Sequence, residues 1–408
     1  MLRIRLLASS IALLLGSSSA FATNGYFSHG YGMKAKGMAG VGIALPQDSI
    51  AAATNPAGMA LIGDRADLGL DVFKPSRGAE VTGAGGLGNG TFDGNGKSYF
   101  FIPEFGYNKT LNQNSSLGVS VYGNGGMNTS CKSSPFGPNA GINLEQLFIA
   151  PTWAIKVSPQ HSLGVAVNLV YQTFSATGLG AFAASSSNNL ALTDNGKDTS
   201  TGIGLHLGWT GELTPTLTVG ATYQPKTKMS KFSKYAGLFA EQGGFDIPAS
   251  YGVGIAVKAT PETTIAADYV TIQYGGVASV ANSVSAGGPL GANNGMGFGW
   301  TDVKVIKLGI SQVVSDSLTV RAGYSHNTQP IPTTQTLFNI LAPGVVQDHL
   351  TLGATWNVSR QNEITVAYMH AFEKKVDGPG AIPAGFGGGN ANIHMNENSL
   401  GVAYSWKY

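Results

Sequence analysis

The chain has few charged residues, one cysteine and, after its first segment, no long hydrophobic run. Charged side chains make up 11% of its 408 residues, whereas a soluble domain carries about 25%. No later stretch approaches the roughly 18 consecutive apolar residues that a membrane-spanning helix needs. Yet 43% of the residues are hydrophobic. This composition argues against both an ordinary soluble domain and a helical membrane protein.

Other absences narrow the possible functions. Cys131 is the only cysteine, which excludes an internal disulfide. The net charge of +2, without basic clusters, gives no electrostatic reason to expect a nucleic-acid partner. The spacing of His206, His326 and His349 does not suggest a metal site, and no nucleophile, base and orienting group can be assembled. We therefore expect neither an enzyme nor a bound metal or cofactor.

The first 22 residues have the three parts of a secretory signal peptide. Arg3 and Arg5 precede an apolar run from Leu6 to Leu15, and Ala20-Phe21-Ala22 resembles a cleavage site. We expect cleavage after Ala22. A retained membrane anchor is the alternative.

The chain is rich in glycine, with 58 residues, and in period-two patterns. From residue 65 onward, segments in which apolar and polar residues alternate are separated by Gly, Asn, Ser and Pro, as expected of strands with two unlike faces. The fourteen predicted strands lie near residues 65–74, 98–108, 115–123, 145–157, 162–174, 200–211, 216–225, 249–259, 263–274, 301–313, 317–326, 348–358, 362–373 and 397–408.

Short and long connections alternate between these segments, which is typical of outer-membrane barrels. In the last segment Leu400, Val402 and Trp406 share one face, and Ser399 and Ser405 share the other. We assign the first face to lipid and the second to the lumen. The sequence thus predicts an all-β fold, a transmembrane antiparallel barrel of about 14 strands in the bacterial outer membrane. A soluble β-sandwich or propeller is the alternative.

Residues 23–64 do not alternate. Asp48 is a candidate cap for a short helix through Ala53, which Asn55-Pro56 would end. A barrel of this size leaves a lumen that side chains do not fill, so we expect this segment inside as a hatch; a periplasmic tail is the alternative. The predicted organisation is a signal peptide at 1–22, a hatch at 23–64 and a barrel at 65–408.

The stretch from Gly30 to Ala60, above all Asn55-Pro56-Ala57-Gly58-Met59-Ala60, resembles the hatch of FadL-type transporters of long-chain fatty acids and hydrocarbons. Further matching segments are Tyr223–Lys226, Ile247–Gly252, Arg321–Ser325, Gln329–Pro332 and the closing strand. The resemblance implies a monomeric barrel that binds hydrophobic molecules in its outer loops. It also implies that they leave sideways into the bilayer, through a gap made by an inward kink in a strand.

The same resemblance implies that Asn55, Pro56 and Ala57 lie beside the gap. Candidates for the kink are Gly118, Gly123, Gly125 and Gly126. The expected partners are therefore a hydrophobic small molecule, outer-membrane lipid and, through the terminal aromatic Tyr408, the barrel assembly machinery.

Two of the long connections, 226–248 and 327–347, carry more apolar residues than a solvated loop should. We expect a capture groove there. Its residues would be Phe232, Leu238, Phe239, Leu337 and Phe338.

Alternation places Lys307 and Arg321 in the lumen, where they could bind a ligand carboxylate; pairing between such cations and Asp268 is the alternative. Two further functions stay open at this point, an aqueous porin and a surface receptor or adhesin.

Overall fold

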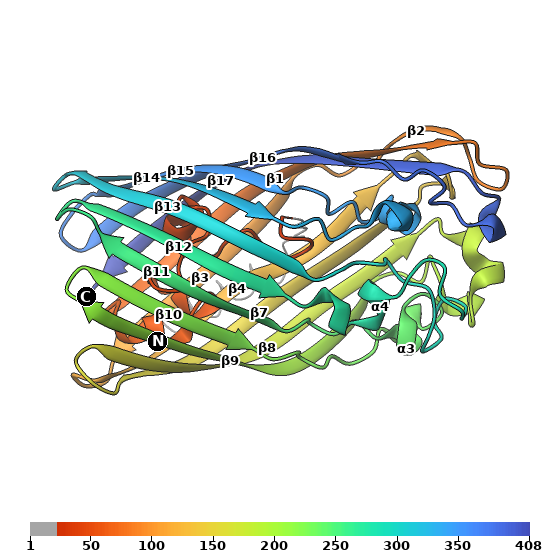
Figure 1. Ribbon diagram of the computed structural model, residues 1–408. Helices are drawn as coiled ribbons and strands as arrows, with labels where there is room; N and C mark the ends of the chain where they lie inside the picture. Colours follow the sequence, from red (N-terminus) through yellow and green to blue (C-terminus); the bar gives the residue numbers. More distant parts are fainter. Residues whose placement is uncertain (1–22) are drawn as a thin grey trace.

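The fourteen-stranded barrel predicted from the sequence is confirmed in the computed structural model, which describes residues 23–408 (Figure 1). The expected signal peptide at 1–22 lies outside the described residues. Each barrel strand pairs antiparallel with the next, and β17 pairs with β1 along its length, from Arg65–Lys407 to Thr82–Asn390. The barrel strands are β1 (Arg65–Thr82), β3 (Phe100–Thr110), β4 (Ser115–Ser130), β7 (Gly141–Lys156), β8 (His161–Thr177), β9 (Asp198–Thr214), β10 (Leu217–Gln224), β11 (Ser250–Lys258), β12 (Thr263–Ile272), β13 (Val303–Ser315), β14 (Leu318–Asn327), β15 (Asp348–Asn357), β16 (Asn362–Val376) and β17 (Asn390–Lys407).

The remaining elements are short. β2 (Gly90–Asp93) pairs with the outer end of β1, and β5 (Ser133–Ser134) pairs with β6 (Gly137–Pro138). Among residues 23–408 there is no helix long and apolar enough to cross a membrane. The helices and helical turns are α2 (Met33–Lys36), α3 (Ala240–Gly243), α4 (Ala278–Ala281), α5 (Thr336–Asn339), η1 (Ala51–Ala53), η2 (Pro56–Ala60), η3 (Gly180–Ser185), η4 (Asn189–Ala191), η5 (Ser233–Tyr235), η6 (Tyr274–Gly276), η7 (Thr333–Gln335) and η8 (Ala384–Phe386).

The two faces of the strands separate as the alternation predicts. Leu400, Val402 and Trp406 of β17 are exposed on the outside, whereas Ala403 and Ser405 are buried on the inside. In β13 the residues from Val303 to Ile310 alternate strictly between buried and exposed. An outward apolar face and an enclosed interior are what a barrel in lipid requires.

Three strands extend seven or more residues beyond the ends that the alternation predicts. β1 continues to Thr82, β4 continues to Ser130, and β17 begins at Asn390. In the outer halves of β1 and β17 polar residues such as Glu80 and Asn392 point outward and apolar residues such as Val81 and Ile393 are buried, so the outward apolar face that marks a lipid-facing strand is lost there. Gly123, Gly125 and Gly126 accordingly lie within β4 and not just after the third strand.

Residues 23–64, here called the N-terminal segment, lie inside the barrel toward the end with the short turns (Figure 1). The expected helix from Asp48 is only a turn of 3-10 helix, η1, and Asp48 Oδ1 accepts from the Ile50 amide at 3.0 Å. Asn55 both follows that turn and begins the next one, since its Oδ1 accepts from the Ala57 amide at 3.1 Å.

Glycine on the lumen face lets this segment approach the wall. A Cβ at Gly208 of β9 would lie 1.9 Å from Asn55 Oδ1, and one at Gly164 of β8 would lie 2.2 Å from the carbonyl carbon of Pro56. Neither distance is possible for a real side chain, so the glycine-rich wall is partly an adaptation to its contents.

Candidate binding pocket and wall gap

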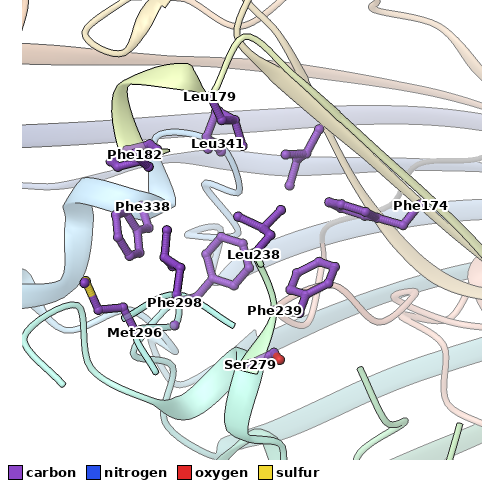
Figure 2. Close-up of a pocket in the computed structure, with 13 residues that line it drawn as sticks. Phe174, Leu179, Phe182, Leu238, Phe239, Ser279, Met296, Phe298, Phe338 and Leu341 are labelled. Atoms are coloured by element: carbon purple, nitrogen blue, oxygen red, sulfur yellow. The ribbon is translucent and has the colours of Figure 1, made fainter. Parts of the chain in front are cut away.

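An apolar pocket lies among the long loops at the outer end of the barrel (Figure 2). Phenylalanine rings surround it; the ring centroids of Phe174 and Phe239 are 4.5 Å apart, and those of Phe182 and Phe338 are 5.3 Å apart. Ser279 is the one polar side chain of the lining, and its Oγ donates to the Gly244 carbonyl at 2.5 Å. The lining residues are Ile142, Phe174, Leu179, Phe182, Leu238, Phe239, Ser279, Leu290, Met296, Gly297, Phe298, Phe338 and Leu341.

The structure brings together residues from both loops expected to form a capture groove. Leu238, Phe239 and Phe338 line the pocket. Phe232 packs behind it, with its ring 6.0 Å from that of Phe239, and Leu337 is buried outside the lining. Sequence reasoning missed the contributions of loops 178–197 and 273–302, although isolated apolar residues among Gly, Ser and Asn in both loops are the signal that could have found them.

The barrel wall is interrupted between β3 and β4. These strands pair only from Phe105–Val121 to Thr110–Ser116. Beyond that point β3 stays paired with β1, and β4 stays paired with β7. The chain next to β3 meets β4 again only at the bridge between Asn95 and Ser130. We call the interval between these two places the ladder gap.

A β-bulge bends β4 at the ladder gap. Its register against β7 shifts between Gly123 and Gly125, which inserts one extra residue and turns the strand. Of the glycines considered for a kink, Gly118 lies instead in the regular part of β4, where a Cβ would meet Met59.

The N-terminal segment lies against the ladder gap through its first residues. Phe27 forms a bridge with Gly125 of β4. The Tyr31 hydroxyl donates to Asn124 Oδ1 at 3.1 Å, and the rings of Tyr31 and Tyr122 are 4.9 Å apart. A second, more polar cavity, lined among others by Phe27, Tyr31 and Asn124, lies behind these contacts.

Asn55, Pro56 and Ala57 lie deeper in the barrel, against β8 and β9. Asn55 Nδ2 donates to the carbonyls of Ile43 at 2.7 Å and Trp209 at 3.0 Å. The part of the N-terminal segment that lies at the ladder gap is thus its start, around Phe27, and not this motif.

Buried ion pairs hold the N-terminal segment to the wall. Lys34 of α2 contacts Glu363 of β16 at 2.5 Å, and Lys36 contacts Asp71 of β1 at 2.6 Å. On another side of the lumen, Asp268 Oδ2 accepts from the backbone amides of Gly42 and Ile43.

Lys307 and Arg321 also bind protein groups. Lys307 Nζ donates to the carbonyls of His29 at 2.9 Å and Gly40 at 3.3 Å, while facing the second cavity. Arg321 donates to Gln47 Oε1 at 3.1 Å and to Thr355 Oγ1 at 2.7 Å. Neither side chain lines the apolar pocket. Within residues 23–408 no three His, Cys, Asp or Glu side chains are grouped as metal ligands.

One protein family accounts for these features together. The profile of the family described as "Outer membrane protein transport protein (OMPP1/FadL/TodX)" matches residues 11–404. The chain belongs to this family. It is therefore an outer-membrane barrel of a family of transport channels for hydrophobic compounds.

Several solved structures share the fold of this chain. A FadL homologue of Pseudomonas aeruginosa matches with a TM-score of 0.73 and 18% identity, covering 94% of this chain and 99% of that one. The toluene transporter TodX of P. putida gives 0.68 and 18%, with 93% and 99% covered. The toluene transporter TbuX of Ralstonia pickettii gives 0.65 and 20%, with 93% and 99% covered. No curated protein sequence matches the chain.

Proposed function

We propose that the protein takes up small hydrophobic compounds passively, by capture in the apolar pocket and sideways release through the ladder gap into the bilayer. The observation that carries this proposal is the pocket lining, whose one polar side chain is already hydrogen-bonded. An apolar solute gains about 0.8 kcal/mol for each methylene it buries there. A charged solute would lose its hydration without finding a partner.

The anchoring of the N-terminal segment favours a sideways exit. A path along the barrel axis requires the segment to move, which would break the buried pairs Lys34–Glu363 and Lys36–Asp71. Breaking one buried pair costs about 3–5 kcal/mol. A path through the ladder gap leaves both pairs intact, so in this proposal residues 23–64 act as a fixed hatch in a mature chain that begins after Ala22.

Within the hydrophobic class, the lining favours an uncharged hydrocarbon over a fatty acid at the capture step. Lys307 and Arg321 lie away from the pocket and donate to protein oxygens, so a carboxylate entering there meets neither cation. Two of the similar structures are toluene transporters, which supports an aromatic hydrocarbon such as toluene. Lys307 remains our candidate for a carboxylate partner further along the route, with Arg321 as the second candidate.

The test is uptake of labelled toluene by cells that lack other uptake systems for it. We expect the protein to raise the initial rate, and Phe239→Asp and Phe338→Asp to lower it at least tenfold, because each places a charge in a dry pocket. Leu190→Asp is the matched control, since Leu190 is 85% exposed on a loop and outside the lining. Steady ion conductance in planar bilayers, without toluene uptake, would indicate an aqueous porin and would contradict the proposal.

A further inference from the structure

The edge of β4 along the ladder gap finds hydrogen-bond partners other than β3. The Asn124 carbonyl accepts from the Ser28 amide at 2.9 Å, and the Gly126 amide donates to the Tyr26 carbonyl at 2.9 Å. The N-terminal segment thus replaces β3 at this height, which matters because unpaired backbone groups facing lipid are costly.

At the outer end of the same edge, the loop before β3 supplies the hydrogen bonds. The Ser130 amide donates to the Gly94 carbonyl at 3.0 Å, and its carbonyl accepts from the Gly96 amide at 2.8 Å. Asn128 lies between Gly126 and Ser130, and its backbone is hydrogen-bonded neither to the N-terminal segment nor to the loop before β3.

The Asn128 carbonyl and Oδ1 accept instead from a side chain of β1, whereas Asn128 Nδ2 donates to Asn143 Oδ1 of β7 at 2.9 Å. Arg77 is 1% exposed. Its Nε donates to the Asn128 carbonyl and its Nη2 to Asn128 Oδ1, both at 2.7 Å. Nη2 also donates to the Lys97 carbonyl at 2.9 Å. One guanidinium therefore connects β1 directly to the outer half of β4.

This use of an arginine is specific. Every acceptor just named is a neutral oxygen, and none of the ion pairs found within residues 23–408 includes Arg77. A buried cation without an ion pair is costly. The rigid fork of a guanidinium reaches several acceptors at once, which a lysine ammonium at one point does not.

We propose that Arg77 is a positioning residue for release: it holds the outer half of β4 away from β3 and so keeps the ladder gap from closing. Without the guanidinium, the Asn128 carbonyl loses its donor, although Asn128 Nδ2 still donates to Asn143 Oδ1. The edge of β3 that faces the gap then becomes an alternative source of a hydrogen bond for this carbonyl. The role in transport rests on the proposed function, whereas the effect on the wall does not.

The wall is tested with a single reporter cysteine. In a chain carrying Cys131→Ser, Ile102→Cys places a thiol on the lumen face of β3 beside the gap, where Ile102 is buried. The protein is placed in liposomes and treated with a lipid-soluble maleimide. We expect Arg77→Met to slow labelling roughly tenfold, the scale of losing one hydrogen bond to a charged group. Arg77→Lys should lie between Arg77→Met and the unaltered residue.

The direction in which the labelling rate changes distinguishes a positioning role from general destabilisation of the barrel, because the cysteine of a destabilised barrel would be labelled faster. Arg321→Met is the matched control for removing a buried lumen arginine, and it should leave the labelling rate within twofold. Unchanged or faster labelling in Arg77→Met would overturn the proposal.

Transport is read separately. In Arg77→Met the initial rate of toluene uptake should fall in step with labelling, while the affinity of the purified protein for toluene stays within twofold, since the apolar pocket is untouched. Parallel loss of affinity and uptake would contradict a positioning role. If the unaltered protein takes up no toluene, the proposed function fails, and the labelling experiment still decides whether Arg77 holds the wall.

Discussion

Replacing Lys36 by methionine tests how the N-terminal segment is held in the lumen. Lys36 Nζ lies 2.6 Å from Asp71 Oδ2, and the two side chains are 9% and 4% exposed. Methionine keeps the length and the apolar stem but removes the charge. Asp71 is then left buried without its cation, for which the usual cost is about 3–5 kcal/mol in the free energy of unfolding.

The assay is urea unfolding of the barrel in liposomes, with protease sensitivity of residues 23–64 as a second readout. Lys36→Met should unfold at lower urea and expose the segment to protease. The double variant Lys36→Met/Asp71→Asn should recover most of the loss, because removing both charges of a buried pair is often close to neutral. Lys109→Met is the control: its pair with Asp64 is half exposed at the lysine, so its loss should cost less than about 1 kcal/mol.

Two results would contradict this prediction. One is a Lys36→Met protein as stable as the unaltered chain. The other is a double variant as unstable as the single one, since the cost would then not come from an uncompensated charge.

Two more predictions concern the same segment. Burial and the nearby Asp67 carboxylate raise the pKa of Asp48 from 3.8 to about 6. The folded state therefore binds the proton more tightly than the unfolded state does. The contribution of Asp48 to the free energy of unfolding then falls as the pH rises from about 4 to 6. Asp48→Asn should match the unaltered chain near pH 4 and exceed it at pH 7.5 in urea unfolding; a difference that is the same at both pH values would contradict this. Gly208→Ala should destabilise the barrel by about 1–3 kcal/mol, because its Cβ would collide with Asn55 Oδ1. Gly180→Ala is the control and should not destabilise the barrel, since a Cβ there meets no atom within 4 Å. Equal urea midpoints for the two variants would show that the N-terminal segment can withdraw from the wall.

The sequence predicts the barrel well because contact with lipid requires an alternation of residue types that is visible along each strand. Each strand that crosses the bilayer must turn apolar residues outward at every second position, as β13 does with Ile306, Leu308 and Ile310. That constraint ends where a strand leaves the membrane, and the outer halves of β1, β4 and β17 were not predicted for this reason.

The candidate site could be predicted only where single residues stand out. Phe239 and Phe338 are conspicuous in polar loops and do line the pocket. The bond between Arg77 and Asn128 joins strands on either side of β3, and the contact of Phe27 with Gly125 joins the start of the chain to the wall. Local patterns carry no information on such distant pairs.

The most direct test of sideways release is deletion of Asn124, the extra residue of the bulge in β4. Removing it takes the bend out of β4, so that β4 can continue beside β3 and close the ladder gap. Electrophoretic mobility before and after heating checks that the barrel folds, and toluene binding to the purified protein checks the apolar pocket. We predict a folded protein that binds toluene with unchanged affinity and no longer takes it up; uptake at the rate of the unaltered chain would contradict sideways release.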